Sequence, residues 1–270
     1  MLKIIDSHTH NYPEALAARA AENLGKFYNF TVEESGTFSR LEEVQRECGV
    51  CGFVLLSVAT SPKNVPHIND FASERMKQAR ADGFECAAFG CMHADFPDFE
   101  AELDRFGSLG LCGVKIQSDL VGINCDCDRL MQVYESLERR GLALYLHAGD
   151  DRADVRFSSP ERIANVAASF PKLRIAAAHL GGYREWDNAE KTLMGKYENV
   201  WYDCSSTLEF MDAKRGKYLI EKCGTDRVMY ASDYPAISPR TSIRAFMNVD
   251  FTDGEREDIC YNNVRKFIKF

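Results

Sequence analysis

The sequence lacks any apolar stretch long enough to cross a membrane. No run approaches the roughly 18 apolar residues that a transmembrane helix requires. Lys3 and Asp6 interrupt the first apolar run, where a secretory signal peptide has its apolar centre. We therefore expect a cytoplasmic protein with no membrane partner.

An excess of positive charge is also missing. The 33 Lys and Arg residues are outnumbered by 41 Asp and Glu residues, so the formal net charge at pH 7 is −8. This balance offers no broad basic surface for nucleic acid or an anionic membrane, although it is compatible with a local basic pocket. The chain is 45% hydrophobic and 27% charged, which is ordinary for a globular protein and argues against disorder.

The ten cysteines are expected to be reduced thiols, because no secretion signal accompanies them. Cys48 and Cys51 form a C-x-x-C pair, and Cys125 and Cys127 form a C-x-C pair. Cys51 opens an apolar run, whereas a redox pair places its first thiol exposed at a helix N-terminus. A four-thiolate zinc site usually has two tight pairs at regular spacing. We expect neither a redox nor a zinc-binding role for these pairs.

Eight short apolar runs, rich in β-branched residues, alternate with longer amphipathic stretches, as in repeated β-α units. Most runs lack polar alternation, as parallel strands covered on both faces do. Eight units in 270 residues average about 34 residues each, which is near the average of a TIM barrel. The sequence predicts one single-domain (β/α)8 TIM barrel over residues 1–270, with strands in the runs 2–7, 52–58, 84–92, 111–117, 142–146, 174–178, 200–204 and 227–231.

Sequence signals also place several helices. Asp128 and Gly141 are the residue types of a helix start and end, and apolar residues recur three and four apart between them. Ser159-Pro160-Glu161 predicts another helix start. A last helix, from Asp253 to about residue 267, would close the barrel. The Ala-rich stretch 13–24 is expected to be a helix that covers part of the barrel mouth.

Chemistry in a TIM barrel takes place at the C-terminal ends of the strands, where the loops are free to vary. Ionisable side chains gather at this end of five predicted strands: His8 and His10 in the first, Lys115 in the fourth, His147 in the fifth, His179 in the sixth and Asp233 in the eighth. Because residues two apart on a strand face the same way, His8 and His10 should point together into the barrel. Imidazoles suit zinc and similar divalent ions, and a carboxylate completes a site with one position open for water. A single histidine is more often structural, but their coincidence at one end favours an active site.

Five short segments carry a family resemblance: DSHTH at 6–10, GVKI at 113–116, LHAG at 146–149, AHLGG at 178–182 and ASDYP at 231–235. They resemble the amidohydrolase superfamily, and in particular its amidohydrolase-2 branch, the metal-dependent TIM-barrel hydrolases related to aminocarboxymuconate-semialdehyde decarboxylase. The segments HIND at 67–70 and YNNVRK at 261–266 also look like that branch, so the resemblance covers nearly the whole chain.

The resemblance implies that His8, His10, His147 and Asp233 are metal ligands. It implies two alternative roles for His179, which either binds a second metal or, in one-metal members, polarises the substrate or assists proton transfer. Asp233 would also accept a proton from metal-bound water. We expect Asp233 and His179 to be catalytic and the cofactor to be a divalent metal, with zinc the first choice and one ion favoured over two.

Lys115 should point into the barrel, where an ammonium group is costly unless it is paired. Three roles stay open. Lys115 is carbamylated and bridges two metals, as in the two-metal members it resembles, or it is a cation that binds a substrate carboxylate, or it forms an ion pair with Asp6. We favour the substrate-binding cation, because single-metal sites are frequent in this branch.

Other residues near the predicted strand ends are candidates for binding a substrate. An arginine there can reach a carboxylate or phosphate. The candidates are His93 after the third strand, Arg152 and Arg156 after the fifth, and Arg184 after the sixth. Asp203 and Ser205 could support the site, and Trp186 or Tyr234 could stack on a planar substrate.

The first functional hypothesis is a metal-dependent hydrolase that acts on a small, anionic carboxylated or cyclic amide, ester or lactone. The alternative is a metal-dependent, non-oxidative decarboxylase of a carboxylated aromatic or muconate-like substrate, in which His179 or Asp233 manages the proton. A TatD-like nuclease is less favoured, since such enzymes usually have Glu in place of Lys115 and the acidic balance attracts DNA poorly. A non-catalytic metal-binding or partner-binding barrel is a fourth hypothesis. A homo-oligomer is compatible with all four, and fold analogy does not identify the substrate.

Overall fold

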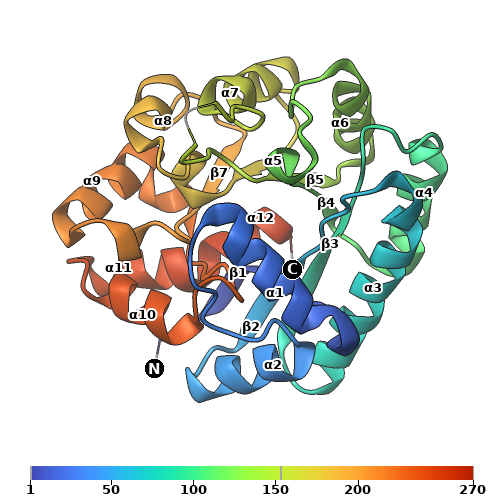
Figure 1. The fold of residues 1–270 in the computed structure, drawn as a ribbon. Helices are drawn as coiled ribbons and strands as arrows, with labels where there is room; N and C mark the ends of the chain where they lie inside the picture. Colours follow the sequence, from blue (N-terminus) through green and yellow to red (C-terminus); the bar gives the residue numbers. More distant parts are fainter. Residues whose placement is uncertain (1, 153, 270) are drawn as a thin grey trace.

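The computed structural model describes residues 2–152 and 154–269. Eight parallel strands follow one another in sequence order around a barrel (Figure 1). They are β1 (Ile5–Thr9), β2 (Gly52–Leu56), β3 (Glu85–Cys91), β4 (Gly113–Ile116), β5 (Ala143–Leu146), β6 (Ile175–Ala177), β7 (Val200–Asp203) and β8 (Val228–Met229). Where the last strand returns to the first, the amide of Ser7 donates to the Tyr230 carbonyl (3.0 Å). The predicted (β/α)8 TIM barrel is confirmed.

Helices connect the strands and form the outer layer of the barrel (Figure 1). They are α1 (Glu14–Tyr28), α2 (Phe38–Glu47), α3 (Val65–Ala81), α4 (Phe99–Leu109), α5 (Ser118–Val121), α6 (Asp128–Arg140), α7 (Pro160–Ser169), α8 (Trp186–Thr192), α9 (Ala213–Cys223), α10 (Pro239–Met247), α11 (Asp253–Glu257) and α12 (Asn263–Ile268). Short helical turns are η1 (Pro62–Asn64), η2 (His179–Gly181), η3 (Leu208–Phe210), η4 (Thr225–Arg227) and η5 (Asp258–Asn262). None of the helices in the described residues is long and apolar enough to span a membrane.

The predicted helix boundaries are close to those observed. α6 begins at Asp128 itself, one residue earlier than expected, and Gly141 ends it in the left-handed conformation (φ 68°). α7 begins at Pro160 directly after Ser159. The predicted last helix is present over residues 253–268 without a break, and its middle turn η5 is π-helical between α11 and α12. There the Ile259 carbonyl accepts a hydrogen bond from the Tyr230 amide of the barrel (2.8 Å), which ties the helix end to the sheet.

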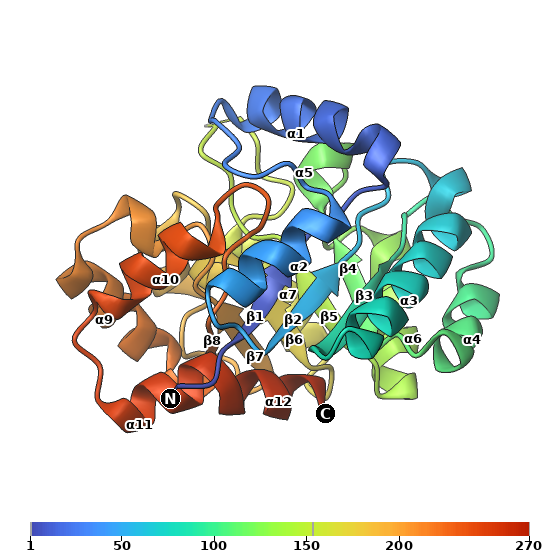
Figure 2. The same ribbon diagram turned by 90° about the horizontal axis from the view of Figure 1, so that it is seen from below.

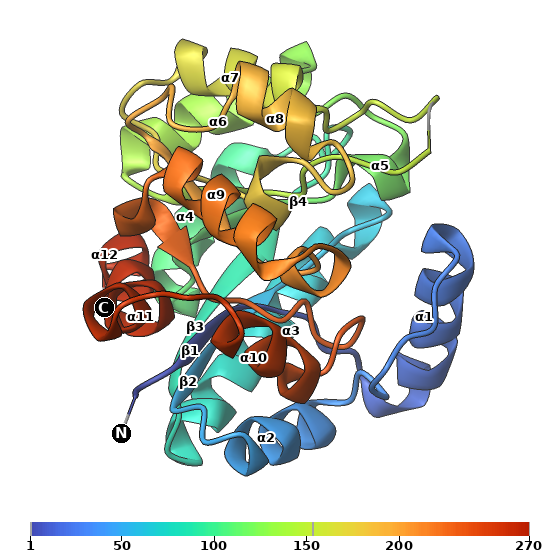
Figure 3. The ribbon, with the colours of Figure 1, turned by 90° about the vertical axis from the view of Figure 1, so that its left-hand side faces the viewer.

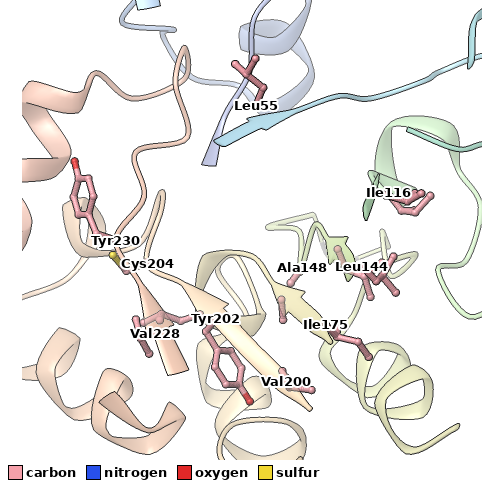
Figure 4. Close-up of a cluster of buried hydrophobic side chains, with 14 of the residues drawn as sticks. Leu55, Ile116, Leu144, Ala148, Ile175, Val200, Tyr202, Cys204, Val228 and Tyr230 are labelled. Atoms are coloured by element: carbon pink, nitrogen blue, oxygen red, sulfur yellow. The ribbon is translucent and has the colours of Figure 1, made fainter. Parts of the chain in front are cut away.

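Apolar side chains form two layers, because successive residues of a strand face opposite sides of the sheet. The outer layer lies between the strands and the helices, and Figure 4 shows part of it, with Leu144, Ile175 and Val200 on neighbouring strands. The inner layer fills the barrel and includes Phe89. Phe267 of α12 stacks on Phe89 with ring centroids 6.1 Å apart, so α12 closes the N-terminal end and leaves the C-terminal end for chemistry.

The helix predicted at the barrel mouth is present as α1, which lies apart from the ring of outer helices (Figures 2 and 3). Only Ala17 and Tyr28 of this helix are buried, and Leu16 is 55% exposed. A 15-residue helix is marginally stable by itself in water, so α1 depends on a few contacts with the barrel beneath it.

Candidate active site

His8 in β1 and His10 directly after it each keep one ring nitrogen free for a ligand. The Nδ1 atom of His8 donates to Asp203 Oδ2 (2.8 Å), and Nδ1 of His10 donates to the Leu56 carbonyl (2.8 Å). Both Nε2 atoms therefore carry lone pairs, and they face each other at 3.0 Å. Asp233 Oδ1 lies 3.3 Å from the first and 3.7 Å from the second. Three acceptor atoms that converge in this way suit a cation.

A second pair of acceptor atoms lies beside the first. His147, directly after β5, donates from Nε2 to the Gly149 carbonyl (3.0 Å), and His179, after β6, donates from Nδ1 to the Ser205 carbonyl (3.0 Å). This leaves His147 Nδ1 and His179 Nε2 as lone pairs, which face each other at 3.0 Å. The rings of His8 and His179 stack with centroids 5.3 Å apart, so the two pairs form one cluster.

Asp203 supports this cluster from the end of β7. Its Oδ2 atom also accepts from the hydroxyl of Tyr145 (2.6 Å), and Oδ1 accepts from the amides of His179 and Ser205 (both 3.0 Å). Burial favours protonation of this carboxyl, yet His8, His179 and Ser205 hold its pKa below the ordinary value. Asp203 could also be grouped with His8 and His179 as a metal ligand, but its oxygens already serve these donors. It therefore acts as a fixed anion that sets the tautomer of His8 and holds the backbone of His179.

Two residues of the cluster adopt backbone conformations that L-residues rarely take. His179 has φ 57° and Asp233 has φ 71°, in the left-handed region that costs about 1–2 kcal/mol for a residue with a Cβ. Hydrogen bonds hold both: the His179 amide donates to Asp203 Oδ1, and the Asp233 amide donates to the His8 carbonyl (3.0 Å each). Such strain is typical of functional sites, where it aims a side chain that a relaxed turn would not.

Burial keeps the histidines neutral, as metal ligation requires. Desolvation and the charge of Lys115 lower the pKa of His10 to about 3, and burial lowers that of His179 to about 4. The pKa values of His8 and His147 are also well below the ordinary value, mainly because of burial. Burial raises the pKa of Asp233 to about 7, against the hydrogen bond from Ser206 Oγ to its Oδ2 atom (2.7 Å).

Lys115 is a buried cation that finds no hydrogen-bond partner for Nζ within the described chain. Its ammonium group lies 5.0 Å from the centroid of the Tyr145 ring. The ion pair with Asp6 that the sequence left open is not formed, because Asp6 accepts from Gln45 Nε2 (2.7 Å) and Ser232 Oγ (2.6 Å) instead. Burial lowers the pKa of Lys115 to about 8, while Asp203 and Asp233 act in the opposite direction.

The cluster opens into a cavity of about 680 Å³ at the barrel mouth. The six residues predicted from the strand ends all line it: His8, His10, Lys115, His147, His179 and Asp233. The remaining walls are largely apolar, and α1 contributes Leu16, Ala20, Leu24 and Tyr28. A lone cation and a cluster of neutral histidines thus face an apolar chamber, which suits a small anion with an apolar body.

The loop residues proposed as substrate contacts are placed elsewhere. None of His93, Arg152, Arg156 and Arg184 is among the described residues that line the cavity. His93 accepts a hydrogen bond from the Asp95 amide (3.1 Å). Arg152 forms an ion pair with Asp150 and lies over the Phe27 ring, 4.1 Å from its centroid. Arg156 pairs with Glu185 (3.0 Å), and Arg184 lies over the Phe210 ring, 4.0 Å from its centroid. Acidic and aromatic neighbours occupy these arginines and hold them away from the chamber.

The two aromatic side chains proposed for stacking are also engaged outside the chamber. Trp186 donates from Nε1 to the His179 carbonyl (3.1 Å), so it braces the histidine from outside. Tyr234 is buried and donates to the Thr37 carbonyl (3.1 Å).

Tyr28, Gln117 and Tyr145 are among the polar residues at the site that were not predicted. Tyr145 lies on β5 two residues before His147, and this inward-facing spacing is a signal that could have found it. Gln117 follows β4 two residues after Lys115 and donates from Nε2 to the Tyr28 hydroxyl (2.7 Å). Tyr28 belongs to α1, whose position over the mouth depends on contacts far away in the sequence.

The cysteine pairs supply no ligands. All ten cysteines are free thiols, and none belongs to either candidate group of metal ligands in the described residues. Burial raises the pKa values of Cys51 and Cys125, which keeps both protonated.

Comparison with known proteins identifies the family of this chain. The family model described as amidohydrolase (Amidohydro_2) matches residues 5–270. Comparison with curated proteins gives no match.

Solved structures share the fold over the whole length at low sequence identity. An uncharacterised TIM-barrel protein from Bordetella bronchiseptica has a TM-score of 0.78 and 17% identity, and 99% of each chain is covered. 5-Carboxyvanillate decarboxylase from Sphingomonas paucimobilis has a TM-score of 0.71 and 17% identity, with 100% of each chain covered. Dihydroxybenzoic acid decarboxylase from Polaromonas sp. JS666, solved with manganese and the inhibitor 2-nitroresorcinol, has a TM-score of 0.69 and 17% identity over 100% of this chain and 97% of its own. Because the family model spans nearly all of the sequence, this chain belongs to the amidohydrolase family.

Proposed function

We propose that this protein is a metal-dependent, non-oxidative decarboxylase of a small carboxylated aromatic or muconate-like substrate. The observation that carries the proposal is the combination of an apolar chamber with Lys115, the one Lys or Arg among the described residues that line it. Two of the solved structures with this fold are decarboxylases of carboxylated aromatic compounds. This replaces hydrolysis, the first hypothesis from the sequence, with its alternative.

The cavity supports such a reaction through its polarity. When a carboxylate leaves as neutral CO2, the carbon–carbon bond breaks and its electron pair stays on the ring carbon, which then takes a proton. An apolar wall disfavours the charged carboxylate more than neutral CO2, so desolvation assists the loss. Lys115 would bind the anionic substrate. The proton that the ring carbon takes would come from water or from the substrate, and the lone pair of His179 Nε2 or the carboxylate of Asp233 would accept it first and pass it on.

The donor set fits a divalent metal, because the free nitrogens of His8 and His10 converge with the carboxylate of Asp233. The free Nδ1 of His147 lies beside this group, 3.0 Å from Nε2 of His179. We propose these four residues as the ligands of one ion, with His179 free for proton transfer. When bound, the ion would supply positive charge that stabilises negative charge on substrate oxygens. Zinc is our expectation from the residue types, and the manganese in the Polaromonas structure makes manganese an equal candidate.

The test is an assay of products with protein purified without chelators. The metal is identified by elemental analysis, and the protein is then incubated with 5-carboxyvanillate, dihydroxybenzoates, lactones, esters and amides. We expect CO2 release from a carboxylated ring, equimolar with the decarboxylated product, and loss of activity in H8A/H10A. Opening of a lactone or cleavage of an ester or amide without CO2 release would contradict the proposal and restore the hydrolase hypothesis.

A further inference from the structure

A second polar group at the end of β4 faces the cavity. Gln117 lies two residues after Lys115, is about nine-tenths buried and lines the chamber. Its Nε2 atom donates to the Tyr28 hydroxyl (2.7 Å), whereas Oε1 has no hydrogen-bond partner in the described part of the chain. A buried acceptor without a donor is unfavourable, and a ligand with a donor would satisfy it.

Tyr28 holds the nitrogen end of this amide. The hydroxyl of Tyr28 accepts from Gln117 and lies 3.4 Å from Nε2 of His147. Its ring is held in turn by Arg152, whose guanidinium lies 5.9 Å from the ring centroid and is locked to Asp150 by two hydrogen bonds (2.7 and 2.6 Å). In this orientation Nε2 is engaged by Tyr28, and Oε1 is left as the buried acceptor without a partner.

Lys115 and Gln117 are arranged to bind two groups of one small molecule. Residues two apart in an extended chain are about 7 Å apart and face the same side. Lys115 offers a positive charge and Gln117 offers an acceptor, so together they match an anion that carries a hydrogen-bond donor. The apolar walls around them match a ring between these two groups.

We propose that Gln117 is a specificity-determining residue that accepts a hydrogen bond from a hydroxyl or amino substituent on the substrate ring, and that Tyr28 is its positioning residue. This inference rests on the proposed function, because it takes the substrate to be a carboxylated ring bound beside Lys115. It adds that the ring carries a hydrogen-bond donor, and it identifies Gln117 as the side chain that accepts from this donor.

The test measures binding, separately from turnover. Isothermal titration calorimetry on metal-loaded protein gives the Kd of benzoate and of its hydroxy, amino and methoxy derivatives, with the substituent at each ring position. Hydroxy or amino derivatives substituted at the matching position should bind at least about tenfold more tightly than benzoate, since a site built for a donor rejects the analogue that lacks it. Methoxy derivatives accept but cannot donate, so they should show no such gain.

Variants connect this preference to Gln117. The similar-sized Gln117→Met change should bring the preference for the donor group close to one while the Kd of benzoate stays within about threefold. Tyr28→Phe should lower the preference only partly, because the amide then loses its holding partner but keeps its acceptor.

The exposed residues Gln132 and Tyr218 provide matched controls, and Gln132→Met and Tyr218→Phe should keep the wild-type preference. A purely structural role of Tyr28 would weaken benzoate and its derivatives alike and leave the preference unchanged. Circular dichroism checks the fold, and if Gln117→Met does not fold, Tyr28→Phe still decides.

Each outcome separates this inference from the proposed function. An unchanged preference in Gln117→Met, or methoxy derivatives that bind as well as hydroxy derivatives, would overturn the role of Gln117 even if CO2 is released. A preference that depends on Gln117 in a protein that releases no CO2 would support the inference and contradict the decarboxylase. If the wild-type protein binds none of these ring anions, the inference is wrong, and the assay of CO2 release decides separately on the proposed function.

Discussion

The Nε2 atoms of His8 and His10 lie 3.0 Å apart, and neither can donate a hydrogen bond to the other. Each ring has already committed its proton at Nδ1, to Asp203 or to the Leu56 carbonyl. Two lone pairs at this distance repel unless a cation lies between or beside them. A resident metal would therefore stabilise the fold as well as supply the chemistry.

Removal of the metal should accordingly lower the thermal stability of the protein. Dialysis against a chelator is expected to reduce the melting temperature, and added divalent metal should restore it in a concentration-dependent way. Scanning calorimetry on the metal-free and reloaded protein measures this. H8A/H10A serves as the control, since the chelator should leave its melting temperature unchanged. An equal shift in that variant would show that the metal acts elsewhere.

Asp203 should control metal affinity although it is not one of the proposed ligands. Asp203→Asn replaces the charged acceptor of His8 Nδ1 with a neutral amide, so the imidazole becomes a weaker ligand and its tautomer is less well fixed. We expect metal affinity to fall about 10- to 100-fold. Competition with a fluorescent chelator measures the change. The control is Asp187→Asn, since the Asp187 side chain is 85% exposed and pairs with Arg215 on the surface. Equal affinities in the two variants would remove the positioning role.

The sequence predicted the fold and the six cavity residues for one physical reason. Strand parity and the common direction of parallel strands bring residues such as His8 and Asp233 to one end of a barrel, wherever they lie in the chain. The sequence did predict a helix over the mouth, but only for residues 13–24, so Tyr28 in the last turn of α1 was missed. The positions of the three arginines outside the cavity could not be predicted for a different reason. Sequence shows that Arg152 follows His147, but it does not show that Asp150 and Phe27 bind its guanidinium first.

Lys115 should make the stability of the metal-free protein depend on alkaline pH. Because burial lowers its folded-state pKa to about 8, from an ordinary value of 10.5, the unfolded chain binds more protons between these values. The cost of the buried charge is fully present below pH 8, and stability recovers as pH rises from 8 to 10.5. The difference in pKa corresponds to about 3 kcal/mol in the free energy of unfolding at neutral pH.

Lys115→Met should therefore have a higher free energy of unfolding than wild type at pH 7. This difference should shrink towards pH 10.5, as measured by urea unfolding. A constant advantage across this range would contradict a buried ammonium group.

Arg152 should hold α1 over the cavity. Its guanidinium lies 4.1 Å from the Phe27 ring centroid and is anchored to Asp150, so it joins the end of α1 to the loop after β5. α1 buries only Ala17 and Tyr28, so the loss of one contact should matter more here than elsewhere. A cation–π contact is worth about 0.5–2 kcal/mol, and Arg152→Ala should therefore speed amide hydrogen exchange in residues 14–28 by about 2- to 30-fold. Arg156→Ala removes a neighbouring, mostly exposed arginine that pairs with Glu185 and should leave this exchange unchanged. Mass spectrometry of peptic fragments resolves the segment. If Arg152→Ala also weakens benzoate binding while the β-strands keep their protection, α1 closes the cavity as a lid. Equal exchange in the two variants would show that other contacts stabilise α1.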